Sequence, residues 1–111
     1  MAHLPKDDLS QVPDIAPVQL LVHIQPKAGK EDEVASHLAK IQAKANSDDE
    51  PDTTVYRVSK SVQGPVTFIV YEEYKTKAGM KHHTEQEEFK AFFAKAGELL
   101  ELIHPRWFTK L

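Results

Sequence analysis

A glutamate and a histidine in the second half of the chain are of the types that move protons. Glu72 lies on the otherwise apolar side of a strong strand pattern, with Phe68 and Val70 before it and Tyr74 after it. A carboxylate at such a position is costly unless it is paired. We expect Glu72 to accept a hydrogen bond from His83 and fix its tautomer, so that the other ring nitrogen can take a phenolic or enolic proton from a substrate.

Removal of such a proton would leave an electron-rich aromatic anion that can react with molecular oxygen directly, without a bound cofactor. The alternative is that Glu72 and His83 only tie a helix to the sheet. Replacing His83 with alanine separates the two interpretations, because unchanged turnover of an accepted substrate would exclude this residue as the base.

Five further side chains are candidates for the wall of a substrate pocket: His23, Tyr56, Tyr74, Phe89 and Trp107. His23 faces away from its apolar strand neighbours, which is also consistent with a surface or interface position. Phe89 and Trp107 belong to a set of aromatic residues whose spacing is equally typical of a hydrophobic core.

The adjacent histidines His82 and His83 could bind a metal ion only together with further ligands. The candidate further ligands are Glu85, Glu87 and His104. Side chains of neighbouring helix residues point about 100° apart, so they do not easily share one ion. The sequence also lacks a glycine-rich phosphate loop, a Rossmann fingerprint and a Ser-His-Asp context. It therefore predicts no metal and no cofactor.

The composition fits a single folded domain, because 41% of the 111 residues are hydrophobic and 28% are charged. Fourteen basic and seventeen acidic residues are interleaved and give a net charge of −3, which argues against nucleic-acid binding. There is no cysteine, no apolar run of the roughly 18 residues that a membrane helix needs, and no signal-peptide pattern in residues 1–17. We expect a cytoplasmic protein with no nucleic-acid or membrane partner.

Hydrophobic periodicity and turn residues predict six elements after an N-terminal extension over residues 1–17. They are strands over 18–25, 53–61, 66–74 and 99–108, a helix over about 30–46, and a helical segment over 76–97. Thr76 is placed to cap the second helical segment, and Pro105 places the last strand at an edge or a bulge. The β α β β α β order predicts an α+β, ferredoxin-like domain over residues 18–111. Its four-stranded antiparallel sheet would carry the helices on one face.

Apolar residues occur on both sides of the predicted strands. Leu21, Ile69, Tyr71 and Ile103 are assigned to the sides opposite Leu20 and Val70. The sheet face without helices is therefore partly apolar, and monomers rarely leave a large apolar patch in water. We predict a homodimer in which two sheets pack face to face.

Two segments near the start of the domain resemble the antibiotic biosynthesis monooxygenase (ABM) family. Val22–Glu31 is similar to the family's strand ending in a Lys-Pro-Gly-Lys-Glu-type turn, with Ala28 intervening. Glu50–Val58 is similar to the family's Glu-Pro-Gly followed by a strand with an aromatic residue, with Asp52 in place of the usual glycine. Aspartate tolerates left-handed backbone angles better than most residues, so this turn can be retained.

A third segment carries the most specific part of the resemblance. Phe68–Tyr74, followed by His83 and Phe89, matches the family's strand glutamate, helix histidine and following aromatic residue in register. The resemblance covers Val18–Leu102 and implies a dimeric α+β barrel.

The resemblance also implies a function. It suggests a cofactor-independent monooxygenase that oxidises a small hydrophobic aromatic, quinol or polyketide-like molecule with molecular oxygen. Haem-degrading relatives use an asparagine on the first strand and a tryptophan on the third, where this chain has His23 or Gln25 and Tyr74. The alternatives are a non-oxidative isomerase or cyclase of a small carbonyl compound, in which His83 and Glu72 move protons without oxygen, and a non-catalytic small-molecule-binding dimer.

Overall fold

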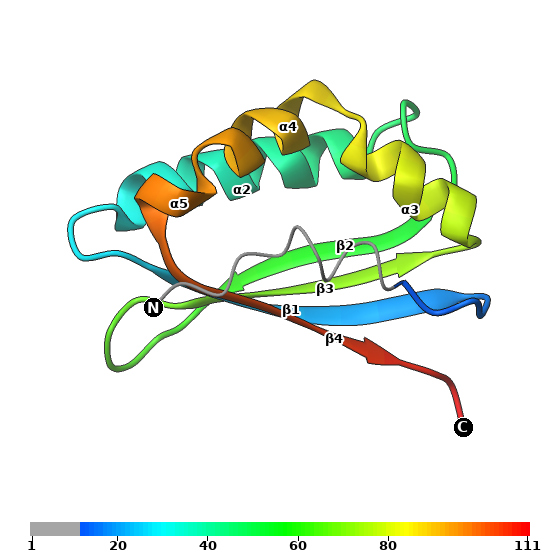
Figure 1. Cartoon of the computed structure of the whole chain (residues 1–111), viewed down its shortest axis with the longest axis horizontal. Helices are drawn as coiled ribbons and strands as arrows, with labels where there is room; N and C mark the ends of the chain where they lie inside the picture. Colours follow the sequence, from blue (N-terminus) through cyan, green and yellow to red (C-terminus); the bar gives the residue numbers. More distant parts are fainter. Residues whose placement is uncertain (1–11) are drawn as a thin grey trace.

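The computed structural model describes residues 12–111, in which four strands form one antiparallel sheet in the order β2-β3-β1-β4. The strands are β1 Val18–Pro26, β2 Thr53–Lys60, β3 Phe68–Tyr74 and β4 Leu100–Phe108. The helices are α2 Glu31–Ala45, α3 Lys77–Thr84, α4 Glu87–Ala94 and α5 Ala96–Leu99. All of them lie over the same face of the sheet, as Figure 1 shows. The predicted ferredoxin-like α+β fold is confirmed.

The sequence patterns explain the local structure of the two best-defined elements. In β1, Val18, Leu20, Val22 and Ile24 are buried, whereas the residues between them are half-buried or exposed. In α2, the buried residues recur every three or four positions and form one stripe against the sheet: Val34, Leu38, Ile41 and Ala45. Both elements therefore contribute one apolar side to a shared core.

The second helical segment is divided into three short helices. Thr76 caps α3, as predicted, because its hydroxyl accepts a hydrogen bond from the backbone N–H of Gly79 at 3.2 Å. The first break follows α3, where Gln86 is extended and its side-chain amide donates to the carbonyl of His82 at 3.2 Å. That bond satisfies a helix-end carbonyl, so the chain can change direction before α4.

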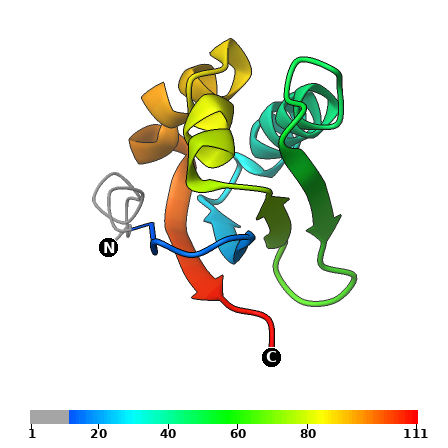
Figure 2. The same cartoon turned by 90° about the vertical axis from the view of Figure 1, so that its right-hand side faces the viewer.

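The core lies between the helices and the inner face of the sheet, and Figure 2 shows this two-layer arrangement end-on. Strand β4 is an edge strand that pairs with β1 alone, so Pro105 sits at an edge as predicted. Within residues 12–111, no helix is long and apolar enough to cross a membrane.

The outer face of the sheet, which none of the described helices covers, is mixed in character. Ile69 is 39% exposed, and Leu21 and Tyr71 are half-buried on the same face. The assignment of Ile103 to this face was wrong. Ile103 pairs with Ile24 and is buried on the inner face, because the register between β1 and β4 shifts between Gln25 and Pro26, so simple alternation along β4 does not hold there.

Polar groups also occupy the outer face. The Gln19 side chain donates to Glu73 at 2.8 Å, and the guanidinium of Arg57 lies 5.7 Å from the centroid of the Tyr71 ring. The predicted N-terminal extension over residues 1–17 falls mostly outside the described residues, which begin at Val12.

Candidate functional site

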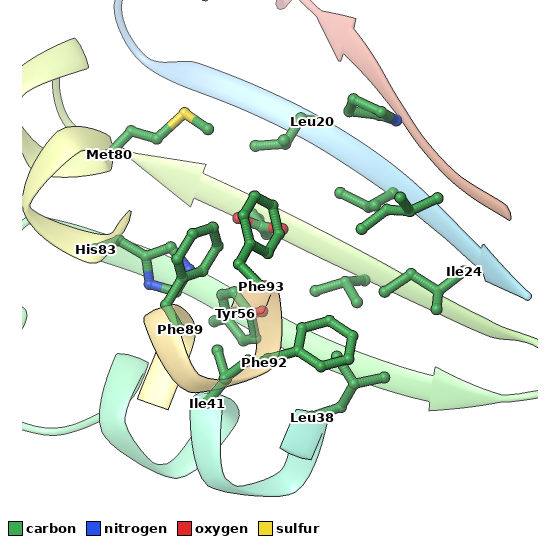
Figure 3. A pocket seen from close by; sticks show the side chains of 15 residues that line it. Leu20, Ile24, Leu38, Ile41, Tyr56, Met80, His83, Phe89, Phe92 and Phe93 are labelled. Carbon is green, nitrogen blue, oxygen red and sulfur yellow. The ribbon is translucent and has the colours of Figure 1, made fainter. Parts of the chain in front are cut away.

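A narrow cavity lies between the inner face of the sheet and helices α2, α3 and α4, with an internal volume of about 40 Å³. Figure 3 shows its lining, with His83 and Phe89 side by side and Tyr56 below them. Twelve of its lining side chains are apolar, and the other three belong to Tyr56, Glu72 and His83. An apolar cavity with a few converging polar groups is the usual form of a small-molecule site.

His83 places one ring nitrogen in a hydrogen bond and leaves the other without one. The residue is only 1% exposed, and its Nδ1 lies 2.8 Å from Oε1 of Glu50. Its Nε2 is buried and has no hydrogen-bond partner among residues 12–111. When the ring is neutral, the Nδ1 proton faces the carboxylate, so Nε2 carries the lone pair. The histidine is thus arranged to accept a proton or a hydrogen bond.

Glu50, in the turn between α2 and β2, holds His83 from outside the cavity. It is 3% exposed, and its Oε1 also accepts a hydrogen bond from the Thr53 hydroxyl at 2.9 Å. Burial by itself would raise the pKa of the Glu50 carboxyl, but the hydrogen bonds from His83 and Thr53 and the nearby histidine charges outweigh it and lower that pKa. Glu50 is therefore an ionised partner for the imidazole.

The predicted hydrogen bond between Glu72 and His83 is wrong. Glu72 instead bonds through Oε1 to the Tyr74 hydroxyl, at 2.5 Å, while Glu50 takes the histidine. The reason is the placement of α3, whose His83 faces the turn before β2. Burial is the main cause that raises the pKa of the Glu72 carboxyl above its usual value of 4.5. Glu72 thus tends towards the neutral form, unlike Glu50.

Three aromatic rings surround His83. The centroid of its imidazole lies 5.0 Å from that of Tyr56, 5.5 Å from that of Tyr74 and 5.2 Å from that of Phe89. Burial raises the pKa of both tyrosine hydroxyls well above 10, and the charge of Glu72 adds to this effect. Both tyrosines are therefore neutral at physiological pH. They enclose the histidine in an apolar setting in which electrostatic interactions are stronger than in water.

Three contacts join the turn that carries Glu50 to α3 and to the residue just before its cap. The backbone N–H of Lys75 donates to the carbonyl of Asp52 at 2.9 Å. Gly79 lies so close to this turn that a Cβ atom there would be 2.7 Å from the Cβ of Asp52. Nε2 of His82 lies 2.7 Å from the Asp49 carbonyl. These contacts fix the distance between the turn and the helix that bears His83.

The structure brings some of the predicted pocket residues together and separates others. Tyr56 and Phe89 line the cavity with Glu72 and His83. Tyr74 lies behind the lining and contacts it through Glu72 and His83. His23 lies on the outer face, because it pairs with Ile69 and is exposed. It therefore lies outside the cavity.

Trp107 is half-buried and packs on the edge of the core opposite Leu20, but it does not line the cavity. Sequence reasoning missed Glu50, which was interpreted only as part of a turn. The signal was present, since Glu50 opens the Glu-Pro segment that resembles the family. Its burial could not be foreseen from a polar loop.

Within residues 12–111, no group of three histidine, cysteine or acidic side chains is placed to hold a metal ion. His82 is exposed and turns to Asp49, whereas His83 is buried and turns to Glu50. The two adjacent histidines therefore point to different parts of the turn.

Solved structures share this fold at low sequence identity. PA3566 from Pseudomonas aeruginosa is 18% identical with a TM-score of 0.79, over 89% of this chain and 98% of that protein. Rv0793 from Mycobacterium tuberculosis is 18% identical with a TM-score of 0.77, over 86% of this chain and 96% of that one. SO0527 from Shewanella oneidensis is 18% identical with a TM-score of 0.76, over 86% of this chain and 91% of that protein.

Among curated proteins, none matches the sequence. Residues 17–95, however, match the family described as antibiotic biosynthesis monooxygenase. This match extends over well more than half of the chain and includes Glu50, Glu72, His83 and Phe89. The chain belongs to the antibiotic biosynthesis monooxygenase family.

Proposed function

We propose that this protein is a cofactor-independent monooxygenase that oxidises a small, hydrophobic, hydroxylated aromatic molecule with molecular oxygen. One observation carries the proposal: the buried Nε2 of His83 has no partner among the described residues and belongs to a residue that lines an apolar cavity. Buried polar atoms normally have a hydrogen-bond partner, so an orphan at a cavity calls for a donor on a ligand. A phenolic or enolic hydroxyl is such a donor.

The reaction begins when Nε2 of His83 takes the hydroxyl proton of a phenol or enol. The resulting anion passes one electron to oxygen, and the substrate radical and superoxide combine to form a carbon–oxygen bond. Proton return from the imidazolium gives a hydroperoxide. Nε2 then removes the hydrogen on the oxidised carbon, the O–O bond breaks, a carbonyl forms, and hydroxide leaves with that proton as water. One oxygen atom is retained in the product.

Glu72 is proposed as the second group that contacts the substrate. Because burial raises the pKa of its carboxyl, the neutral acid can donate a hydrogen bond to a carbonyl or developing oxyanion of the substrate. His83 and Glu72 would then serve different ends of one molecule, the first as acceptor and the second as donor. Tyr56 and Phe89 supply the apolar walls around it.

The size of the cavity limits the substrate. A volume of about 40 Å³ holds a few water molecules, far less than the several hundred Å³ of a typical ligand pocket. Phe89 and Phe93 are half-buried lining residues whose ring centroids lie 4.3 Å apart, so their displacement would open the site to solvent. The small volume of the cavity also favours a second candidate, a non-catalytic dimer that binds small molecules without turnover.

Oxygen consumption with a panel of quinols and anthrones, without added flavin or iron, tests the proposal. Wild type should consume oxygen, and His83→Ala should lose roughly 100-fold or more in turnover. Glu98→Gln, a change at an exposed position in α5 outside the cavity lining, is the control and should behave as wild type. Binding of these compounds without oxygen uptake would favour the non-catalytic alternative. Unchanged turnover by His83→Ala would exclude this residue as the base.

The protein is further proposed to act as a homodimer. Leu21, Ile69 and Tyr71 supply apolar area on the outer face of the sheet, which the described helices leave uncovered. A second copy could cover this area through a two-fold interface between the two sheets. A cytoplasmic location is also proposed, since a chain without cysteine fits a reducing compartment.

A further inference from the structure

We propose that Glu50 is a positioning residue for His83, which keeps the imidazole in the tautomer that presents an unprotonated Nε2 to the substrate. This inference rests on the proposed function for the role of Nε2, but its geometric part is tested without any turnover. Glu50 does not line the cavity, so it would act through the histidine alone.

The first step of the argument is the hydrogen bond itself. A neutral imidazole carries one proton, which can occupy either nitrogen. The Glu50 carboxylate accepts from Nδ1 at 2.8 Å, and its lowered pKa keeps it an acceptor at neutral pH. The partner of one ring nitrogen decides the state of the other. Glu50 therefore selects the form of His83 whose Nε2 has a free lone pair.

The second step is that the pair is poorly arranged for stability alone. Besides Nε2 of His83, Oε2 of Glu50 is buried and has no partner among residues 12–111. A buried carboxylate–imidazole pair with an orphan atom on each member gives little net stabilisation, because the desolvation penalty is not fully recovered. A pair retained only to join α3 to the turn would be better made from apolar side chains.

The third step is that the surroundings hold Glu50 in one place. The Thr53 hydroxyl donates to the same Oε1 that accepts from His83, at 2.9 Å, which fixes the rotation of the carboxylate. The absence of a side chain at Gly79 lets α3 approach Asp52 closely. The turn from Asp49 to Thr53 and helix α3 thus form one unit around the Glu50–His83 bond.

Nitrogen-15 NMR of the His83 ring in the full chain tests the geometric part, under conditions in which the imidazole is neutral. Wild type should show a protonated Nδ1 and an unprotonated Nε2. Glu50→Gln should keep this tautomer, because its amide oxygen can take the place of Oε1 beside the Thr53 and His83 donors. Glu50→Leu removes the acceptor and should shift the proton to Nε2.

Kinetics on an accepted quinol or anthrone then separate the two contributions of Glu50. Glu50→Leu should lose roughly 100-fold in kcat, because the base is in the wrong tautomer. Glu50→Gln should lose about tenfold, which corresponds to the missing charge beside the imidazolium. Glu50→Asp should recover part of the loss. Glu98→Gln, at an exposed position in α5, is the matched control and should match wild type.

The two readouts keep the inference apart from the proposed function. If the NMR results are as expected and no compound is oxidised, the positioning of His83 stands and the monooxygenase proposal fails. A wild-type ring protonated on Nε2, or a Glu50→Leu ring that still carries its proton on Nδ1, would overturn the positioning role. Glu50→Gln retains the shape of the site. If the leucine variant fails to fold, the loss of kcat in Glu50→Gln still measures the effect of the carboxylate charge.

Discussion

Glu50 and His83 are 33 residues apart in the chain, yet Oε1 of one lies 2.8 Å from Nδ1 of the other inside the protein. Both side chains are almost completely buried, and each has one further polar atom without a partner among the described residues. This hydrogen bond joins the turn before β2 to α3 and directs Nε2 of His83 away from the Glu50 carboxylate. The proposed chemistry depends on this direction.

A first prediction concerns the stability of Glu72→Gln. Burial raises the folded-state pKa of Glu72, so its contribution to stability is complete below its usual pKa of 4.5 and is lost as pH rises through the raised value. The neutral amide can still accept from Tyr74. In urea denaturation at pH 8 the variant should therefore be more stable than wild type by about 1–2 kcal/mol. The difference should disappear near pH 4.

Glu98→Gln serves as the control for that change, because it removes an exposed carboxylate and should alter stability little at either pH. A Glu72→Gln variant that is less stable than wild type at both pH values would show that the ionised form of Glu72 is favoured by the fold.

A second prediction separates stability from function at the Glu50–His83 pair. His83→Leu alone leaves the buried Glu50 carboxylate with the Thr53 hydroxyl but without its imidazole partner, and should cost about 3–5 kcal/mol of unfolding free energy. The double variant Glu50→Met with His83→Leu removes both polar groups and should lie within about 1 kcal/mol of wild type, or above it. Chemical denaturation at pH 7 measures both. A double variant as unstable as the single one would mean that the pair is held chiefly for stability.

A third prediction concerns the close approach of α3 to the turn. In Gly79→Ala the added Cβ would lie 2.7 Å from the Cβ of Asp52, so the turn or the helix must shift, at a cost of about 1–3 kcal/mol. Gly97→Ala is the matched control, because a Cβ there meets nothing within 4 Å. It should be neutral or stabilising by up to about 1 kcal/mol. Equal effects of the two substitutions in denaturation experiments would contradict the tight packing at Gly79.

A fourth prediction concerns substrate size. Phe93→Ala removes one of the two adjacent rings, Phe89 and Phe93, that partly close the cavity and should admit larger aromatic ligands. The dissociation constant for a three-ring phenol, measured by calorimetry, should fall by about tenfold, because less binding energy is spent on moving the ring. Val62→Ala, at a position that is 98% exposed, should leave it unchanged. Weaker binding to the Phe93 variant would show that this ring holds the ligand rather than obstructs it.

A fifth prediction concerns the dimer. Wild type should sediment as a dimer at micromolar concentration, and Ile69→Lys should sediment as a monomer, because it places a charge in the proposed interface. Val62→Lys lies in the exposed segment between β2 and β3 and should remain dimeric. A monomeric wild type would refute the proposed interface.

Much of the fold could be predicted because its signals are local. The alternation in β1 and the buried stripe of α2 each reflect one apolar side facing a common core. The placement of Ile103 was wrong because the face of an edge strand is set by its register with β1, and a shift of one residue inverts it.

The site was less predictable because it depends on contacts between distant segments. His83, Glu72 and Phe89 were predicted as site residues, and the structure gathers them at one cavity. The hydrogen-bond partner of His83 was predicted wrongly, because the choice between Glu50 and Glu72 depends on how closely α3 approaches the turn at Asp52. That distance is decided by packing, which no spacing in the sequence reveals.

The most direct test of the account is a crystal structure of the protein with a hydroxylated aromatic ligand, such as 2-naphthol, soaked in without oxygen. The account predicts density between α4 and the sheet, with the hydroxyl about 2.7–3.2 Å from Nε2 of His83. Phe89 and Phe93 should be displaced to make room. A ligand bound elsewhere while the cavity stays closed, in a protein that oxidises the same class of compound, would contradict it.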